Sequence, residues 1–83
     1  DCEDFALTKR CLLIEAGFTP GCLWPAICKR DAIGHMVLVV ATSKGDYVLD
    51  TVPDRITKAH ERQVDLKWIS AFDGKDWRLI SLA

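Results

Sequence analysis

The stretch HMVLVVAT, residues 35–42, constrains the fold of this chain more than any other. It is apolar at every position from Met36 to Ala41 and is rich in valine. A run that is apolar at odd and even positions alike, and β-branched, is typical of a strand covered on both faces. The fold therefore has to place other elements on both sides of this strand.

The next segments predict a hairpin that contains this strand. TSKGD has the composition of a turn and YVLD that of a second strand, so we expect a hairpin from Met36 to Asp50. A loop drawn from Ala41 to Asp46 places His35 opposite Asp50. Because side chains alternate between the two faces of a strand, an even loop puts both residues on one face.

Turn residues also divide the remainder of the chain. Cys22 to Arg30 is predicted as a strand, and Pro25 assigns it to an edge or makes it irregular. RDAIG is a turn, and LKWISAF, DGKD and WRLISL predict a second hairpin around Asp73 and Gly74. The polar residues 56–62 are ambiguous, and no element is predicted there.

The N-terminal segment, residues 3–16, has the pattern of a helix. Apolar residues occupy most of its circumference, which indicates a helix covered on most sides. Acidic residues in the first turn suit the positive end of the helix dipole. Gly17 and Pro20 are typical stop signals. One helix followed by mostly antiparallel strands predicts an α+β fold, with the helix packed on one face of a small sheet.

Length and charge set the organisation. Eighty-three residues are enough for one domain with a thin core, so residues 1–83 are predicted to form a single domain. The formal net charge of −1 gives no reason to expect a nucleic-acid partner. No apolar run approaches the roughly 20 residues of a membrane span, so no membrane insertion is expected.

Cysteine spacing argues against a structural metal site or a disulfide scaffold. None of the four cysteines forms the closely spaced pairs of zinc fingers, and four in 83 residues is not dense for a disulfide-rich chain. They are Cys2, Cys11, Cys22 and Cys28. We predict no disulfide at Cys2, because a nucleophilic thiol has to stay reduced.

Three residues could form a nucleophilic site. Cys2 lies at a helix start, where unpaired N–H groups favour a thiolate. His35 opens the apolar strand, and Asp50 ends its neighbour. A thiolate, an imidazole and an orienting carboxylate are the components of cysteine-dependent acyl transfer. The residue pattern leaves a plain alternative, in which Cys2 is a small helix-start residue, His35 a strand-end histidine and Asp50 a turn acid.

Three segments resemble the bacterial transglutaminase-like cysteine proteinases: DCEDFALTKRCLLIEAGF, GHMVLVV and GDYVLD. The family carries its nucleophile in D-C-E-D-[YF]-A, its histidine in G-H-A-V-L and its aspartate in L-D. The resemblance implies a papain-like cysteine peptidase with Cys2 as nucleophile, His35 as general base and acid, and Asp50 as orienter. Met36 stands where the family has alanine. The match covers only about the C-terminal half of a family domain, so the chain is expected to be a fragment.

The resemblance also implies a cofactor, a compartment and partners. Family members depend on Ca²⁺ held by acids beside the cysteine, which makes Asp1 and Glu3 the calcium ligands here. Clustered carboxylates suit this hard cation, which takes six to eight oxygens. Family members act in the periplasm, cut large surface adhesins, and are restrained by a membrane receptor that senses a cyclic dinucleotide. Two alternatives remain: acyl transfer or deamidation by the same triad, and a non-catalytic binding module that retains the fold.

Overall fold

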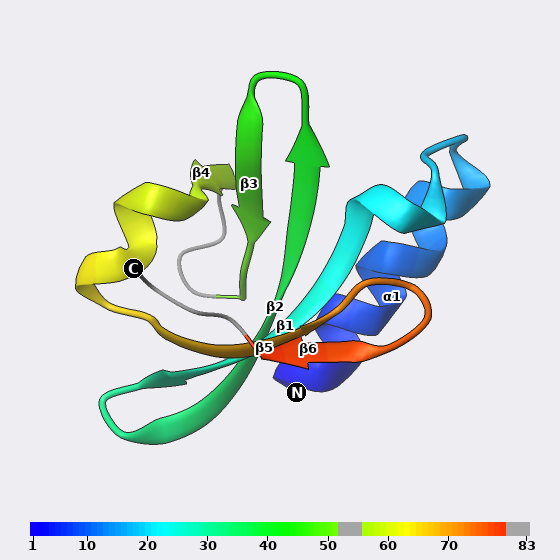
Figure 1. Ribbon diagram of the computed structural model, residues 1–83. Coiled ribbons are helices and arrows are strands. Elements are labelled where there is room, and N and C mark those ends of the chain that lie inside the picture. The colour runs from blue at the N-terminus through cyan, green and yellow to red at the C-terminus, as the bar shows by residue number, and fades with distance from the viewer. Residues whose placement is uncertain (52–55, 80–83) are drawn as a thin grey trace.

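The computed structural model describes residues 1–51 and 56–79. Its elements follow the chain in this order: α1 (Cys2–Glu15), the 3₁₀ helix η1 (Pro20–Cys22), β1 (Leu23–Arg30), β2 (Ile33–Thr42), β3 (Gly45–Leu49), β4 (Ile56–Lys58), the 3₁₀ helix η2 (Ala59–Val64), β5 (Lys67–Phe72) and β6 (Trp77–Leu79). The strands form one sheet of order β4-β3-β2-β1-β5-β6, with antiparallel neighbours throughout. This confirms the α+β prediction (Figure 1).

Helix α1 begins and ends at recognisable caps. The Asp1 carboxylate accepts the backbone N–H of Asp4 at 2.9 Å and caps the N-terminus. At the other end, the N–H of Phe18 donates to Leu13 O and the N–H of Gly17 donates to Ile14 O, with Gly17 at φ +105°. This is a Schellman motif, which needs a residue that tolerates the left-handed conformation.

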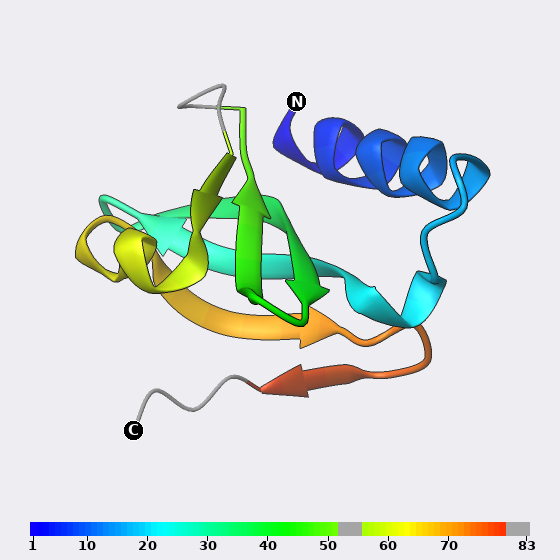
Figure 2. The same cartoon turned by 90° about the horizontal axis from the view of Figure 1, so that it is seen from above.

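Two apolar clusters lie on opposite faces of the sheet. Helix α1 covers the cluster of Ala6, Leu23, Leu38 and Val40. The other cluster lies on the η2 side and comprises Ala26, Cys28, Val37, Val48, Leu66, Trp68 and Ala71. Figure 2 shows the sheet between α1 and η2. Adjacent residues of β2 therefore enter different clusters and are both fully buried, which confirms that this strand is covered on both faces.

The hairpin of β2 and β3 forms with a different register from the one predicted. Val48 pairs with Val39. The predicted register, with His35 opposite Asp50, would pair Val48 with Val37, so the strands are shifted by two residues. The loop is only residues 43–44. The Thr42 hydroxyl closes it by donating to Gly45 O at 2.6 Å and accepting the N–H of Lys44 at 3.1 Å. Because the shift is even, His35 and Asp50 still project from the same face.

Of the two alternatives predicted from Pro25, the edge position is wrong, because β1 lies in the middle of the sheet between β2 and β5. The irregular strand is confirmed, since the register of β1 against β5 shifts between Ile27 and Cys28. Pro25 is opposite Leu38 of β2, while the pairing with β5 begins only at Ala26. The proline therefore occupies the part of β1 that has a neighbour on one side only, where its missing N–H costs no ladder bond to β5.

The second hairpin is confirmed, with β5 and β6 joined by residues 73–76. Residues 80–83 of its predicted second strand lie outside the described residues. The expectation that α1 is covered on most sides is wrong for the described part of the chain. Ala6 is the one buried residue of α1, while Leu7 and Leu12 are about half exposed, because the sheet contacts only one helix face. Among the described residues, no helix is long and apolar enough to cross a membrane.

Candidate active site

His35 and Asp50 form the centre of the site. His35 is the third residue of β2, and Asp50 directly follows β3. The ring Nε2 of His35 lies 2.7 Å from Asp50 Oδ1. This contact assigns the proton of a neutral imidazole to Nε2, which leaves Nδ1 as the basic nitrogen. The arrangement is that of a histidine oriented by a buried carboxylate.

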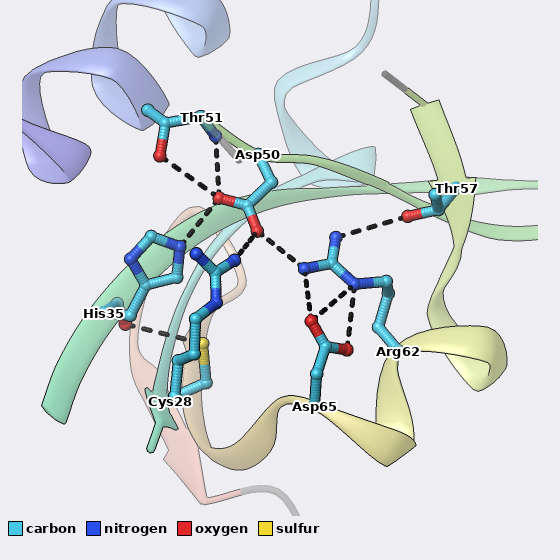
Figure 3. Close-up of polar contacts among 8 residues, drawn as sticks. Cys28, His35, Asp50, Thr51, Thr57, Arg62 and Asp65 are labelled. Carbon is cyan, nitrogen blue, oxygen red and sulfur yellow. Dashed lines mark hydrogen bonds and ion pairs between the residues drawn. The ribbon is translucent and has the colours of Figure 1, made fainter. Parts of the chain in front are cut away.

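The side chain of Asp50 is fully buried, and both of its carboxylate oxygens accept hydrogen bonds. Oδ1 accepts the backbone N–H of Thr51 at 2.6 Å in addition to the contact with His35. Oδ2 accepts Arg30 Nη2 at 2.5 Å and Arg62 Nη2 at 2.8 Å. Figure 3 shows the carboxylate between His35 and Thr51 on one oxygen and Arg62 on the other. With both oxygens engaged, the carboxylate plane cannot rotate without breaking several bonds.

Arg62 is itself paired with a second acid. Its Nε and Nη2 donate to the Asp65 carboxylate at 2.9–3.2 Å, and its Nη1 donates to Thr57 Oγ1 at 3.4 Å (Figure 3). Fork-shaped contacts of this kind are among the stronger polar interactions in proteins. Arg62 is only 4% exposed, so η2 brings a fully paired cation beneath Asp50.

The surroundings keep Asp50 ionised. Burial on its own would raise the pKa of this carboxyl, but hydrogen bonds from His35 and Arg62 and the charge of Arg30 outweigh it and lower the pKa. Asp65 also has a lowered pKa, chiefly because Arg62 donates to it. Both carboxylates are therefore charged at neutral pH.

Cys2 opens helix α1 beside this pair. Its residue lines a pocket of about 260 Å³ together with Glu3, Ile27, Gly34, His35 and Met36. It also lines a neighbouring pocket with Thr51, the residue that follows Asp50. The first turn of the helix thus meets both strand ends that carry the histidine and the aspartate. The structure thus joins His35 to Asp50 and places Cys2 on the lining of a pocket that His35 also lines.

Cys28 is a second thiol near the site but has a different character. It is opposite His35 in the β1–β2 ladder, is fully buried, and its Sγ donates to His35 O at 3.5 Å. Burial, reinforced by the Asp50 charge, raises its pKa to about 11. Cys28 is therefore a neutral packing residue on β1, the strand beside the one that carries His35. All four cysteines are free thiols.

The predicted calcium ligands lie at the exposed start of α1. Asp1 and Glu3 are both exposed, and Asp1 Oδ1 serves as the helix cap. Among the described residues, no three or more histidine, cysteine or acidic side chains are grouped closely enough to hold a metal ion. The two carboxylates suit a hard cation, but they supply only part of the six to eight oxygens that calcium takes.

Sequence reasoning missed Arg30, Arg62 and Asp65. The sequence places Arg30 at the end of a predicted strand and Arg62 in the segment for which no element is predicted. Arg30 and Arg62 lie 20 and 12 positions away from Asp50 along the chain. No local pattern reports such a contact. In a segment without a clear pattern, the sequence does not indicate that an arginine is buried.

Comparison with known proteins places the chain in a family. The family model described as bacterial transglutaminase-like cysteine proteinase BTLCP matches residues 1–81. No curated protein matches the chain. Calcium-bound LapG of Legionella pneumophila is 30% identical with a TM-score of 0.86, covering 95% of this chain and 45% of that one. EGTA-treated LapG is 30% identical with a TM-score of 0.87, covering 99% and 46%.

The chain therefore spans less than half the length of each of these LapG structures. The matched part includes the helix that carries Cys2 and the strands that lead to His35 and Asp50. The family description names a cysteine proteinase, and the geometry above supplies a cysteine beside a histidine oriented by a carboxylate. This chain belongs to the bacterial transglutaminase-like cysteine proteinase family.

Proposed function

We propose that this chain is the catalytic portion of a cysteine peptidase in which Cys2 is the nucleophile, His35 the general base and acid, and Asp50 the orienting residue. The observation that carries the proposal is the bond between His35 Nε2 and Asp50, with Cys2 and His35 lining the same pocket. Membership of a cysteine-proteinase family supports the same reaction.

The residues divide the reaction between them. The Cys2 thiolate attacks the carbonyl carbon of a peptide, and the oxyanion that forms can accept the backbone N–H at the helix start. His35 gives its Nδ1 proton to the leaving amine as the C–N bond breaks. It then takes a proton from the water that attacks the thioester carbonyl. The C–S bond breaks, the carboxylic acid product leaves, and the sulfur departs as thiolate while His35 keeps the proton, which regenerates the thiolate–imidazolium pair. Asp50 keeps Nε2–H in place throughout.

Thiol alkylation tests the catalytic assignment without requiring the substrate. We expect iodoacetamide to modify Cys2 faster than the exposed Cys11 at neutral pH, as measured by mass spectrometry of the peptides. His35→Ala should remove the advantage of Cys2. Equal rates at the two cysteines in the unsubstituted protein would instead support the non-catalytic binding module.

The reaction class needs a separate assay on the full-length protein. Peptide hydrolysis predicts a new N-terminus in a cleaved protein substrate, whereas a transglutaminase would join an amine to a glutamine side chain. Cys2→Ala should abolish either product. Cleavage without amine incorporation is the result expected, and amine incorporation without cleavage would overturn the peptidase assignment.

The proposal includes calcium binding at the helix start, to which Asp1 and Glu3 contribute. The calcium-bound state of one LapG structure supports this, as does the suitability of carboxylate oxygens. When bound, calcium would supply positive charge beside acids that otherwise oppose thiolate formation. Isothermal titration of the full-length protein with Ca²⁺ should show binding that Asp1→Ala and Glu3→Ala both weaken. Unchanged binding in both variants would assign these acids to the helix dipole alone.

The cellular part of the proposal follows the family resemblance: action in the periplasm on a large surface adhesin, under restraint by a membrane receptor. Cell fractionation and the length of the surface adhesin test it. Cells with Cys2→Ala in the chromosomal copy should retain uncut adhesin. Finding the protein only in the cytoplasmic fraction would contradict the periplasmic assignment.

A further inference from the structure

The polar cluster beneath His35 extends beyond the three residues of the proposed triad. Asp50 contacts two arginines, and one of them, Arg62, contacts a second acid, Asp65. Two positive and two negative charges make this cluster of four residues neutral; its members are Arg30, Asp50, Arg62 and Asp65. Protonation of His35 then adds one positive charge beside it. Such a balance is not needed to orient a histidine, since one carboxylate acceptor would do that.

We propose that Arg62 and Asp65 are positioning residues for the catalytic step, and that their opposite charges set how strongly Asp50 stabilises the protonated form of His35. The inference rests on the proposed peptidase function. Arg62 acts on His35 through Asp50, and Asp65 acts through Arg62. Neither is required to touch the substrate.

The contacts give each residue a distinct role. Arg62 Nη2 lies 2.8 Å from Asp50 Oδ2 and 2.9 Å from Asp65 Oδ2, so one nitrogen bridges the two acids. This fixes Oδ2 and leaves Oδ1 directed at His35. At the same time, the positive charge of Arg62 beside Oδ2 weakens the attraction of Asp50 for an imidazolium at His35. Asp65 offsets that effect by neutralising Arg62.

Position on η2 makes the pair adjustable. Arg62 is buried, but the Asp65 side chain is 40% exposed, so the balancing acid is open to solvent while the arginine is not. A change at Asp65 alters the charge on the cluster without inserting a new group into the core. Among the residues that the structure describes, the other titratable or charged groups around His35 or its pocket are Arg30 and Cys28 from β1 and Cys2 and Glu3 from α1. These stay constant when only η2 is changed.

Substitutions at the two residues should have opposite effects on His35. Asp65→Asn leaves the cluster with a net charge of +1, which disfavours the imidazolium. Arg62→Gln leaves it at −1, which favours the imidazolium. We expect the midpoint pH of the His35 ring signal in NMR titrations to fall in the first variant and rise in the second, each by roughly one pH unit. Arg62→Lys preserves the charge and should restore most of the original midpoint.

A matched control is available in the β5–β6 turn. Asp73→Asn makes the same chemical change in another arginine-paired acid at the far end of β5, and it should leave the His35 midpoint unchanged. The exposed His60 provides a second signal in the same spectra. If Arg62→Gln fails to fold, Asp65→Asn and Arg62→Lys still carry the test.

The outcomes separate this inference from the proposed function. Opposite shifts in the two variants support charge balance, because a merely structural role would lower activity in both without opposite titration shifts. Shifts in the same direction, or none beyond that of Asp73→Asn, would overturn it while leaving fast Cys2 alkylation intact. Equal rates of alkylation at Cys2 and Cys11 in the unsubstituted protein would instead count against the peptidase function.

Discussion

Two aspartates that follow strands make a useful comparison. Asp50 follows β3 and Asp73 follows β5, and each accepts at least one backbone N–H and at least one arginine. The partners of Asp73 are residues 75 and 76 of its own turn and Arg78 of the adjoining strand β6. The side-chain partners of Asp50 include residues of β1, β2 and η2. The same acceptor chemistry thus closes a local turn in one place and joins distant elements in the other.

Burial makes the two clusters differ in energy. The side chains of Asp50 and Arg62 are 0% and 5% exposed, whereas the arginine partner of Asp73, Arg78, is 65% exposed. An ion pair in contact with water contributes little, because water and salt replace the partner readily. Removal of one member of a buried pair leaves a charge without its counter-ion in a poorly polar environment. Comparable contacts therefore predict unequal losses.

The largest expected effect is that of Asp50→Ala. The change leaves Arg62 with one acid in place of two and frees the His35 ring, so we expect a loss of about 3–5 kcal/mol in the free energy of unfolding. The fast alkylation of Cys2 should disappear as well. Urea denaturation followed by circular dichroism measures the first effect, and peptide mass spectrometry measures the second.

Asp73→Ala is the matched control for this substitution. It removes a carboxylate of the same type, with its arginine, from the surface turn, and it should leave Cys2 alkylation unchanged. Equal losses of stability in the two variants would show that burial does not separate these clusters.

The same comparison explains what the sequence could predict. The turn at DGKD was predictable because every contact of Asp73 lies within five residues. His35 and Asp50 were predictable from motif resemblance and from the period of two along strands, which survived an error of two residues in the register. Arg30, Arg62 and Asp65 were not, because their contacts depend on the order β3-β2-β1 and on the placement of η2. Neither is encoded in a local pattern.

The acid stability of the two clusters gives the second prediction. The folded-state pKa of Asp50 is lowered below the ordinary carboxyl value, so its contribution to stability is complete above that value, near pH 4. It is lost as the pH falls from there through the folded pKa. The free energy of unfolding of the unsubstituted protein should therefore fall over this window more steeply than that of Asp50→Asn.

Asp73 sharpens this test through its response to salt. Hydrogen bonds from Arg78 and from the backbone of its turn lower its pKa to about 2, so its contribution is lost between about pH 4 and pH 2. Because Arg78 is exposed, 0.5 M NaCl, at which the screening length is only a few ångströms, should reduce the Asp73 contribution and largely spare that of Asp50. Equal salt sensitivity of the Asp50→Asn and Asp73→Asn differences would contradict the assignment of Asp50 to a buried cluster.

The smallest expected effects concern the turns beside the two clusters. The β1–β2 turn directly follows Arg30, which contacts Asp50, and has Ala32 at φ +64°, whereas the turn of Asp73 has Gly74 at φ +97°. A non-glycine residue is strained in the left-handed region. Ala32→Gly should raise the free energy of unfolding by about 0.5–1 kcal/mol, and Gly74→Ala should lower it by about 1 kcal/mol. The space at Gly74 admits a Cβ at 3.7 Å from Arg10 Nη2, so any loss there reflects the backbone. Chemical denaturation of both variants at pH 7 gives the two differences. Destabilisation by Ala32→Gly would mean that the turn beside the Asp50 cluster benefits more from the stiffness of alanine than it loses to its strained backbone.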